Sequence, residues 1–334
     1  MIARRVQFAV AIVALAACKA NSPSTTRETK AAEQAPTAVP ANMSHGEAHV
    51  GTAVDSAPVD PSPPERAKTH VVHVRFEIHD TLIEVSKDVH YRAWSFEGRV
   101  PAPTIRVTQG DSVDFLLVNR AAIPHSMDFH AAEIAPSKYY VNVMPKDSIH
   151  YAFAAQVPGV FMYHCGTAPV AAHIANGMYG ALIVDPRVAR PPAHELVFVQ
   201  SEFYMTPDSA SLPRSLAWDR LLSLAPDYVT FNGRAAQYAT HPIRVKVNEL
   251  LRMYVVNAGP NRFSSFHVVG GIFERVYVDG SQTSPLTGVQ TVSVPVGGGS
   301  IFEIRLKQPG EYPFVTHAFA DATKGAVGIL KAEQ

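Results

Sequence analysis

The sequence predicts an all-β protein made of two tandem Greek-key β-sandwich domains. Many short runs of Val, Ile, Phe and Tyr are separated by turn residues, and the chain has 26 Pro and 20 Gly. This pattern is typical of short strands joined by tight connections. An internal repeat then divides the body in two, because PTIRVTQGDSVDFLLVN (103–119) matches PIRVKVNELLRMYVVN (242–257). Units of about 120 to 140 residues fit a Greek-key sandwich.

The repeat continues through the rest of the body. Three further pairs of segments match: DFHA (128–131) with SFHV (265–268), PGVFMYHC (158–165) with PGEYPFVTHA (309–318), and GALIVD (180–185) with GAVGIL (325–330). We therefore expect a first domain over residues 69–187 and a second over residues 188–334.

The N-terminus has the parts of an export signal. Arg4 and Arg5 precede an apolar stretch that is too short to span a membrane comfortably. The stretch ends in LAAC, which resembles the bacterial lipobox, so residues 1–18 are expected to be a lipoprotein signal with Cys18 as the lipidated residue. An ordinary signal peptide with an incidental Cys is the alternative. Lys19 favours an outer-membrane destination, which makes the protein periplasmic or exposed at the cell surface.

Residues 19–68 are rich in Ala, Pro, Ser and Thr and have no apolar period, which predicts a disordered tether. The chain as a whole is 47% hydrophobic and 17% charged with a formal net charge of +0, a globular composition. Its neutrality argues against a nucleic-acid partner, which would require a basic face. If Cys18 carries lipid, Cys165 is the single thiol of the exported body and has no intramolecular disulfide partner.

The segment YHCGTAPVAAHIANGM (163–178) predicts a use for that thiol. Cys165, His173 and Met178 follow one another closely, and His125 lies upstream in PHSMDFHA. Two His, one Cys and a weak axial Met are the ligands of a blue-copper electron-transfer site. A single His or Met is more often an ordinary core residue, but the joint pattern is hard to obtain by chance. The second repeat lacks it, since Ala318 stands where Cys165 would be.

Two further histidines predict a second metal. Adjacent side chains of a strand leave opposite faces, so His164 points away from the site of Cys165, and His130 likewise points away from that of His125. These two do not complete a metal site by themselves. Their counterparts in the repeat are His267 and His317, so a neighbouring domain could supply a third ligand. We expect a metal shared between the first domain of one subunit and the second domain of another.

Together these segments resemble the copper-containing nitrite reductases, over roughly residues 70–334, and in particular their outer-membrane lipoprotein subclass. The motifs that carry the resemblance are PHSMDFHA, YHCGTAPVAAHIANGMYGALIV, FNG, SSFHVVGGIFERVYVDG and VTHAFADATKGAVG. The resemblance implies cupredoxin-like domains, a homotrimer, two coppers per subunit, and one-electron reduction of nitrite to nitric oxide in denitrification. It also implies a small electron donor, either a cupredoxin or a cytochrome c.

The resemblance assigns a role to each matching residue. The type 1 copper ligands are His125, Cys165, His173 and Met178. The type 2 copper ligands are His130, His164 and His317, with His317 donated across the trimer interface. Asp128 and His267 match the acid–base pair, and Val269 matches an apolar residue that crowds the open coordination position. Electrons would pass from the type 1 to the type 2 copper through the His164–Cys165 peptide.

The match weakens in two places. The family usually has a Gly-rich stretch where this chain has AAEIAPSKYYVNV (131–143), and Ser126 and Met127 replace the commoner Asn and Val. Two alternatives stay open. A surface-tethered copper electron carrier would need no type 2 ligands or acid–base pair. A laccase-like oxidase would need paired H-x-H motifs, which the sequence lacks, and Gly166 follows Cys165.

Overall fold

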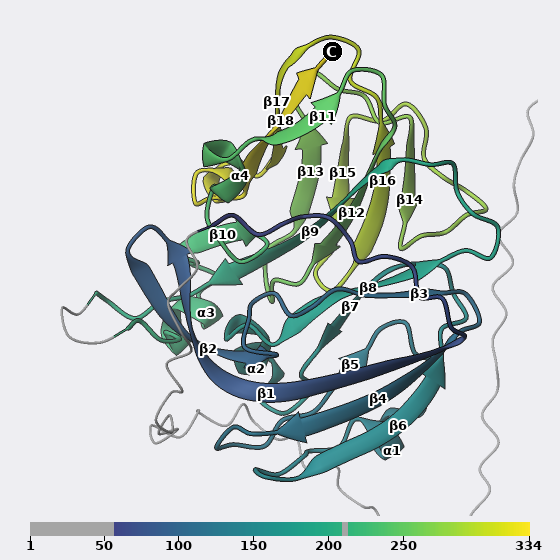
Figure 1. Cartoon of the computed structure of the whole chain (residues 1–334). Coiled ribbons are helices and arrows are strands. Elements are labelled where there is room, and N and C mark those ends of the chain that lie inside the picture. The colour runs from purple at the N-terminus through teal and green to yellow at the C-terminus, as the bar shows by residue number, and fades with distance from the viewer. Residues whose placement is uncertain (1–56, 209–212) are drawn as a thin grey trace, which may run out of the picture. The chain divides into compact units, whose positions relative to one another are not determined.

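The computed structural model describes residues 57–208 and 213–334 (Figure 1). Strands dominate this part of the chain and form two sheets of four strands and two of five, which confirms the all-β prediction. The helices are single short turns: α1 (Pro136–Tyr139), α2 (Val170–Ala175), α3 (Trp218–Leu222), α4 (Gln237–Thr240) and α5 (Phe319–Ala322). Among the described residues, no helix has the length and apolar character needed to cross a membrane.

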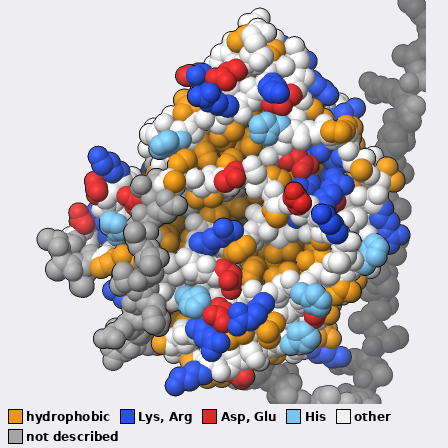
Figure 2. All heavy atoms as spheres, in the orientation of Figure 1, with side chains coloured by type: hydrophobic (Ala, Val, Ile, Leu, Met, Phe, Trp, Pro, Cys, Tyr) orange, Lys and Arg blue, Asp and Glu red, His pale blue; other side chains and the backbone are white. Residues whose placement is uncertain are grey.

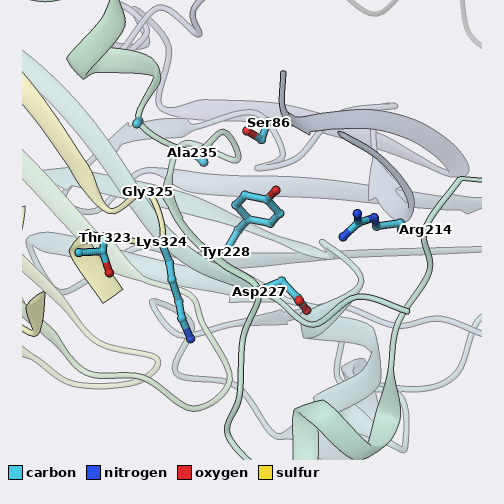
Figure 3. Close-up of a pocket in the computed structure, with 9 residues that line it drawn as sticks. Ser86, Arg214, Asp227, Tyr228, Ala235, Thr323, Lys324 and Gly325 are labelled. Carbon is cyan, nitrogen blue, oxygen red and sulfur yellow. The ribbon is translucent and has the colours of Figure 1, made fainter. Parts of the chain in front are cut away.

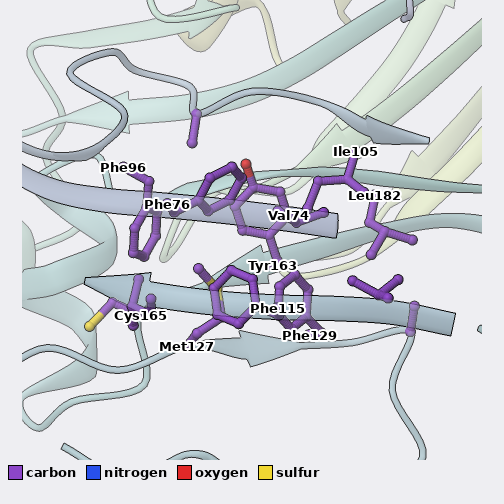
Figure 4. Packing of buried hydrophobic residues seen from close by; sticks show 14 of the residues in the cluster. Val74, Phe76, Phe96, Ile105, Phe115, Met127, Phe129, Tyr163, Cys165 and Leu182 are labelled. Atoms are coloured by element: carbon purple, nitrogen blue, oxygen red, sulfur yellow. The ribbon is translucent and has the colours of Figure 1, made fainter. Parts of the chain in front are cut away.

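The first domain is a sandwich of the two four-stranded sheets. One sheet has the order β2-β1-β4-β6, formed by β2 (Val89–Phe96), β1 (Val71–Ser86), β4 (Ser112–Asn119) and β6 (Ser148–Ala154). The other has the order β3-β8-β7-β5, formed by β3 (Ile105–Thr108), β8 (Tyr179–Asp185), β7 (Gly159–His164) and β5 (Asp128–Phe129). Their inner faces enclose an aromatic core in which Phe76, Phe115, Phe129 and Tyr163 pack together (Figure 4).

The second domain repeats this plan with five-stranded sheets. One has the order β10-β9-β12-β16-β14, formed by β10 (Tyr228–Phe231), β9 (His194–Phe203), β12 (Leu251–Asn257), β16 (Gly299–Ile304) and β14 (Arg275–Val278). The other has the order β11-β18-β17-β13-β15, formed by β11 (Ile243–Lys246), β18 (Val327–Glu333), β17 (Gly310–Thr316), β13 (Ser264–Val268) and β15 (Thr291–Val294). The boundary expected between residues 187 and 188 falls between β8 and β9.

Strand β7 is buried on both faces, and its alternation positions the site. Phe161 and Tyr163 point into the core of the first domain, as does Cys165 just beyond the strand. Val160 and Met162 point the other way, toward the second domain. Because strand side chains alternate between faces, consecutive residues at the end of β7 serve opposite sides of its sheet.

The two domains pack through an apolar layer between β7 and β8 on one side and β9, β12 and β16 on the other (Figure 1). Its fully or almost fully buried members include Val160, Met162, Tyr179, Ile183, Val197, Val199, Tyr254, Val256 and Ile301. Burying large apolar side chains on both surfaces stabilises this pairing by the hydrophobic effect. The second domain is therefore held against the outer face of the sheet that carries β7.

Residues 57–68, which the sequence assigned to the tether, form no helix or strand but lie against both domains. The Tyr238 hydroxyl of the second domain donates to the Val59 carbonyl at 2.9 Å. Arg66 forms an ion pair with Asp185 of the first domain at 3.0 Å. The folded body therefore starts before the expected residue 69. The signal at 1–18 with Cys18, and residues 19–56, lie outside the described residues.

The surface carries charges of both signs. On the face drawn in Figure 2, Lys and Arg side chains are interspersed with Asp and Glu and with scattered apolar side chains. This distribution agrees with the formal net charge of +0.

Candidate metal centres

The first group consists of His125, Cys165 and His173, whose donor atoms converge. His173 Nδ1 lies 3.2 Å from Cys165 Sγ and 3.1 Å from His125 Nδ1, and the distance from Cys165 Sγ to His125 Nδ1 is 3.8 Å. All three residues are buried. One thiol and two imidazole nitrogens directed at one point match the donor set that holds copper in electron-transfer sites.

Burial also sets the protonation of these ligands. It lowers the pKa of His125 well below its ordinary value and lowers the pKa of His173 to about 4. Both rings are therefore neutral at pH 7, with a lone pair available to a metal. Burial raises the pKa of the Cys165 thiol, and hydrogen bonds from Ser126 and Thr167 act against that rise. A cation bound here would favour the thiolate.

Each of these candidate ligands lies in a different segment and is positioned by its backbone. His125 exchanges two hydrogen bonds with Val143, at 2.7 and 3.2 Å, which fixes it beside the loop 131–143. His173 lies on α2, and the Cys165 N–H donates to the Met178 carbonyl at 3.1 Å. Met178 is fully buried in the same core as Cys165. The structure therefore brings His125, Cys165 and His173 together, and Cys165 lies at one end of the aromatic core (Figure 4).

The second group consists of Asp128, His130 and His164. His130 Nε2 and His164 Nε2 face each other at 3.1 Å, and Asp128 Oδ2 lies 3.8 Å from His164 Nε2. His130 is exposed and Asp128 partly so, whereas His164 is buried. Burial and the neighbouring His130 lower the pKa of His164, so it too is neutral. The group is therefore open on one side, as a catalytic metal site must be.

The other nitrogen of each ring is already occupied. His130 Nδ1 donates to the Gly297 carbonyl at 3.0 Å, and His164 Nδ1 to the Cys165 carbonyl at 2.9 Å. Such bonds select the tautomer in which the Nε2 lone pair is free for a metal. Gly297 belongs to the second domain, so the domain pairing helps to orient a ligand of the first. Nothing in the local sequence signals this contact.

His267 and His317 form a separate pair on the second domain, with ring centroids 5.4 Å apart. His317 is exposed and contacts Phe319, and His267 Nδ1 donates to the Gln290 carbonyl at 2.7 Å. Among the described residues, neither makes a hydrogen bond or ring contact with His130 or His164. One chain therefore places the two halves of the expected type 2 site apart.

The pocket drawn in Figure 3 belongs to neither group. It has a volume of about 400 Å³ and is lined in part by Arg214, Asp227 and Lys324. None of the residues lining it is a predicted site residue. Lys324 donates to the Pro226 carbonyl at 2.7 Å, so its ammonium group is already engaged.

Fold and donor sets together define the class of protein. Residues 77–189 and residues 194–332 each match a family model described as multicopper oxidase. The chain is also 38% identical to the copper-containing nitrite reductase of Neisseria meningitidis over 284 residues, which cover 83% of this chain and 73% of that protein. This chain belongs to the copper-containing nitrite reductase family.

Solved structures agree with this assignment. The copper nitrite reductase from Nitrosomonas europaea superposes with a TM-score of 0.74 at 35% identity, covering 79% of this chain and 94% of that one. A copper-containing nitrite reductase from Thermus scotoductus gives the same TM-score and identity over 79% of this chain and 62% of its own. The predicted family and the tandem cupredoxin-like fold are thus confirmed.

Proposed function

We propose that this chain catalyses the copper-dependent one-electron reduction of nitrite to nitric oxide. The observation that carries this proposal is the pair of donor sets on either side of the His164–Cys165 peptide. One set is buried and contains sulfur, and the other is formed by histidines and is open to solvent. The reaction consumes nitrite, one electron and two protons, and it yields nitric oxide and water.

Each set fits one of the two coppers. His125, Cys165, His173 and Met178 would hold a type 1 copper, and His130 and His164 would hold part of a type 2 copper. Copper in these sites supplies one-electron transfer and, at the histidine site, a Lewis acid for an anion. The His164–Cys165 peptide is the shortest covalent route between the two sets, because these adjacent residues belong to different sets. Their side chains leave the end of β7 on opposite faces.

Protons would come from Asp128 and His267. Asp128 is partly exposed and 3.8 Å from His164 Nε2, which is close enough for its carboxyl group to reach an anion bound at that histidine. His267 has one nitrogen on the Gln290 carbonyl, so Nε2 is free to transfer a proton. Carboxyl and imidazole groups are among the side chains that enzymes use for proton transfer. Val269, 42% exposed, would limit the space at the open coordination position.

We infer that the working form is a homotrimer, as the family resemblance implies, because among residues 57–208 and 213–334 no third histidine joins His130 and His164. His317 is exposed on the second domain, and large apolar side chains on the same domain are also exposed, including Phe263 at 59%, Ile272 at 56% and Phe319 at 56%. A neighbouring subunit would contribute His317 and His267 to the site of His130 and His164.

We further propose that the protein is exported and anchored through lipid on Cys18, facing the periplasm or the cell surface, with the outer membrane as its membrane. The support is the LAAC motif behind an apolar stretch. A small cupredoxin or cytochrome c would then be the electron donor. The physiological role would be denitrification.

The decisive experiment measures nitric oxide release by copper-loaded protein with nitrite and an artificial reductant. We expect turnover, two coppers per chain, and one blue and one ordinary copper signal in the EPR spectrum. If the protein holds both coppers and releases no nitric oxide, the electron-carrier alternative would be favoured. A laccase-like oxidase is not favoured. Such an enzyme needs an H-C-H motif, and here Gly166 follows Cys165 in place of the last histidine.

A further inference from the structure

A buried pair of hydroxyl groups lies against the sulfur of Cys165. Ser126 is fully buried, and its backbone N–H donates to Cys165 Sγ at 3.3 Å. The Ser126 hydroxyl accompanies this N–H beside the thiol, and hydrogen bonding from it acts to lower the pKa of Cys165. Gly166 donates its N–H to Ser126 Oγ at 3.0 Å, so the Ser126 hydroxyl is held by the residue that directly follows Cys165.

A hydrogen-bond chain continues from this pair to the loop 131–143. Thr167 Oγ1 lies 3.2 Å from Ser126 Oγ and 2.9 Å from Asn142 Oδ1. Thr167 has one hydroxyl proton for these two acceptors, and Ser126 likewise has one proton. When the Thr167 proton is on Ser126, the Ser126 proton is left for the sulfur. When the Thr167 proton is on Asn142, the Ser126 proton is shared between Thr167 and the sulfur.

The direction of these hydroxyl dipoles matters for a metal held by Cys165. A reduced copper–thiolate site carries one more negative charge than the oxidised one, so an O–H group that can turn toward the sulfur stabilises the reduced state more. Hydrogen bonding at the cysteine sulfur is one of the factors that tune the potential of blue-copper sites. Hydrogen bonds to charged groups contribute more than those between neutral groups.

We propose that the Ser126 hydroxyl, held by the chain Ser126–Thr167–Asn142, raises the reduction potential of the copper bound at Cys165. Ser126 is then a positioning residue that acts on the metal through the sulfur. This inference rests on the type 1 copper of the proposed function. It also gives a role to two places where the sequence departs from the pattern it resembles, Ser126 and the loop that contains Asn142, since both meet at Thr167.

The test is the reduction potential of Ser126→Ala, measured by spectroelectrochemical titration of the visible absorption. The variant keeps the backbone N–H and loses only the hydroxyl. We expect the equilibrium with a redox partner to shift about tenfold toward the oxidised protein, a fall of about 59 mV for a one-electron couple. The absorption should move to longer wavelength, because a sulfur without the O–H donor gives up its electron more easily.

Ser126→Thr keeps a hydroxyl and should restore both the potential and the wavelength. Ser95→Ala is the matched control, since Ser95 is fully buried in the same domain and its hydroxyl contacts Thr81 Oγ1 and the His79 carbonyl. It should leave the potential unchanged. If the wild-type protein is blue and Ser126→Ala has the same reduction potential and the same spectrum, this inference is overturned. The nitrite reductase proposal would remain intact. Wild-type protein that binds copper without blue absorption would overturn the proposed site itself.

Discussion

Asp128 and His164 are direct cross-strand partners on β5 and β7, with Asp128 Oδ2 3.8 Å from His164 Nε2. Because β5 ends at Phe129, immediately before His130, one short strand places both the proposed acid and a proposed metal ligand at the same opening. The carboxyl group is close to the metal ligands but need not bind a metal. This separation between binding and proton transfer can be tested by mutation.

Replacing Asp128 by Asn removes a proton donor and keeps the shape of the side chain. Nitrite turnover should fall by about 10² or more, the usual contribution of a positioned acid. Both coppers should stay bound and the blue site should still accept electrons. Asp147→Asn is the control, because Asp147 is exposed and its carboxylate accepts from the Ser148 N–H, away from the site. Equal turnover in wild type and Asp128→Asn would refute the acid role.

Replacing Cys165 by Ala should give a colourless protein, because the visible absorption of a blue site comes from charge transfer between thiolate and copper. The measurement is the absorption spectrum of copper-loaded protein together with its metal content. The histidine site should keep its copper, since His164 points to the other face of the sheet. An equally coloured variant would show that the thiol is not a ligand.

Replacing His317 by Ala should remove the type 2 copper while the blue colour persists. The reason is that, in the part of the chain that the structure describes, His130 and His164 are grouped with Asp128 and with no third histidine. Metal analysis and EPR measure the loss, and sedimentation measures whether the trimer remains. His241→Ala is the control, because the His241 ring hydrogen-bonds to Thr240 and Gln237 beside it and is not one of the predicted site residues. A monomer that holds both metals and reduces nitrite would contradict the shared site.

Replacing Gly297 by Ala should weaken copper binding at the proposed type 2 site, although Gly297 lies in the second domain and His130 in the first. An added Cβ would lie 3.3 Å from His130 Cε1, and the residue has φ +75°. We expect a 10- to 100-fold loss of type 2 copper affinity, the usual effect of disturbing a residue that orients a ligand. Gly288→Ala separates backbone strain from the contact, because Gly288 has φ +66° and a Cβ there would meet nothing within 4 Å. Chelator competition provides the measurement.

The metal-free protein should lose stability as the pH falls from about 6.5 toward about 4. Burial lowers the pKa of His173 from 6.5 to about 4, so in this range the unfolded chain binds a proton that the folded chain does not. This contribution to stability is complete above the pKa of His173 in the unfolded chain, and it is lost as the pH falls through the pKa of His173 in the folded chain. Urea midpoints of metal-free wild type and His173→Gln at several pH values provide the measurement, with a weaker dependence expected for the variant. Identical slopes would contradict this account.

The candidate ligands of the first centre can be predicted from the sequence because their residue types and spacing are themselves chemical information. Cys165, His173 and Met178 lie within one short segment, and few structural roles require a thiol, an imidazole and a thioether together. The opposite directions of His164 and Cys165 follow from strand alternation alone. The repeat likewise predicts two similar domains, since matched strand patterns fold into matched sheets.

The contacts that adjust the site could not be predicted in this way. Gly297 meets His130 only because the second domain packs against the sheet of β7, and these two residues are 167 positions apart. Asn142 reaches Thr167 from a loop with no recognisable pattern. Residues 57–68 resemble a tether in composition, yet their backbone groups find partners in both domains.

Residue type and a period of two are local properties, so the sequence alone predicts the candidate metal-binding side chains and the face of the strand that each one occupies. The tertiary structure decided which nitrogen of His130 is free, what surrounds the sulfur of Cys165, and that His267 and His317 stand apart from His130 and His164 in one chain. These depend on hydrogen bonds and packing between segments far apart in the chain, and such contacts form only when the whole fold brings the segments together.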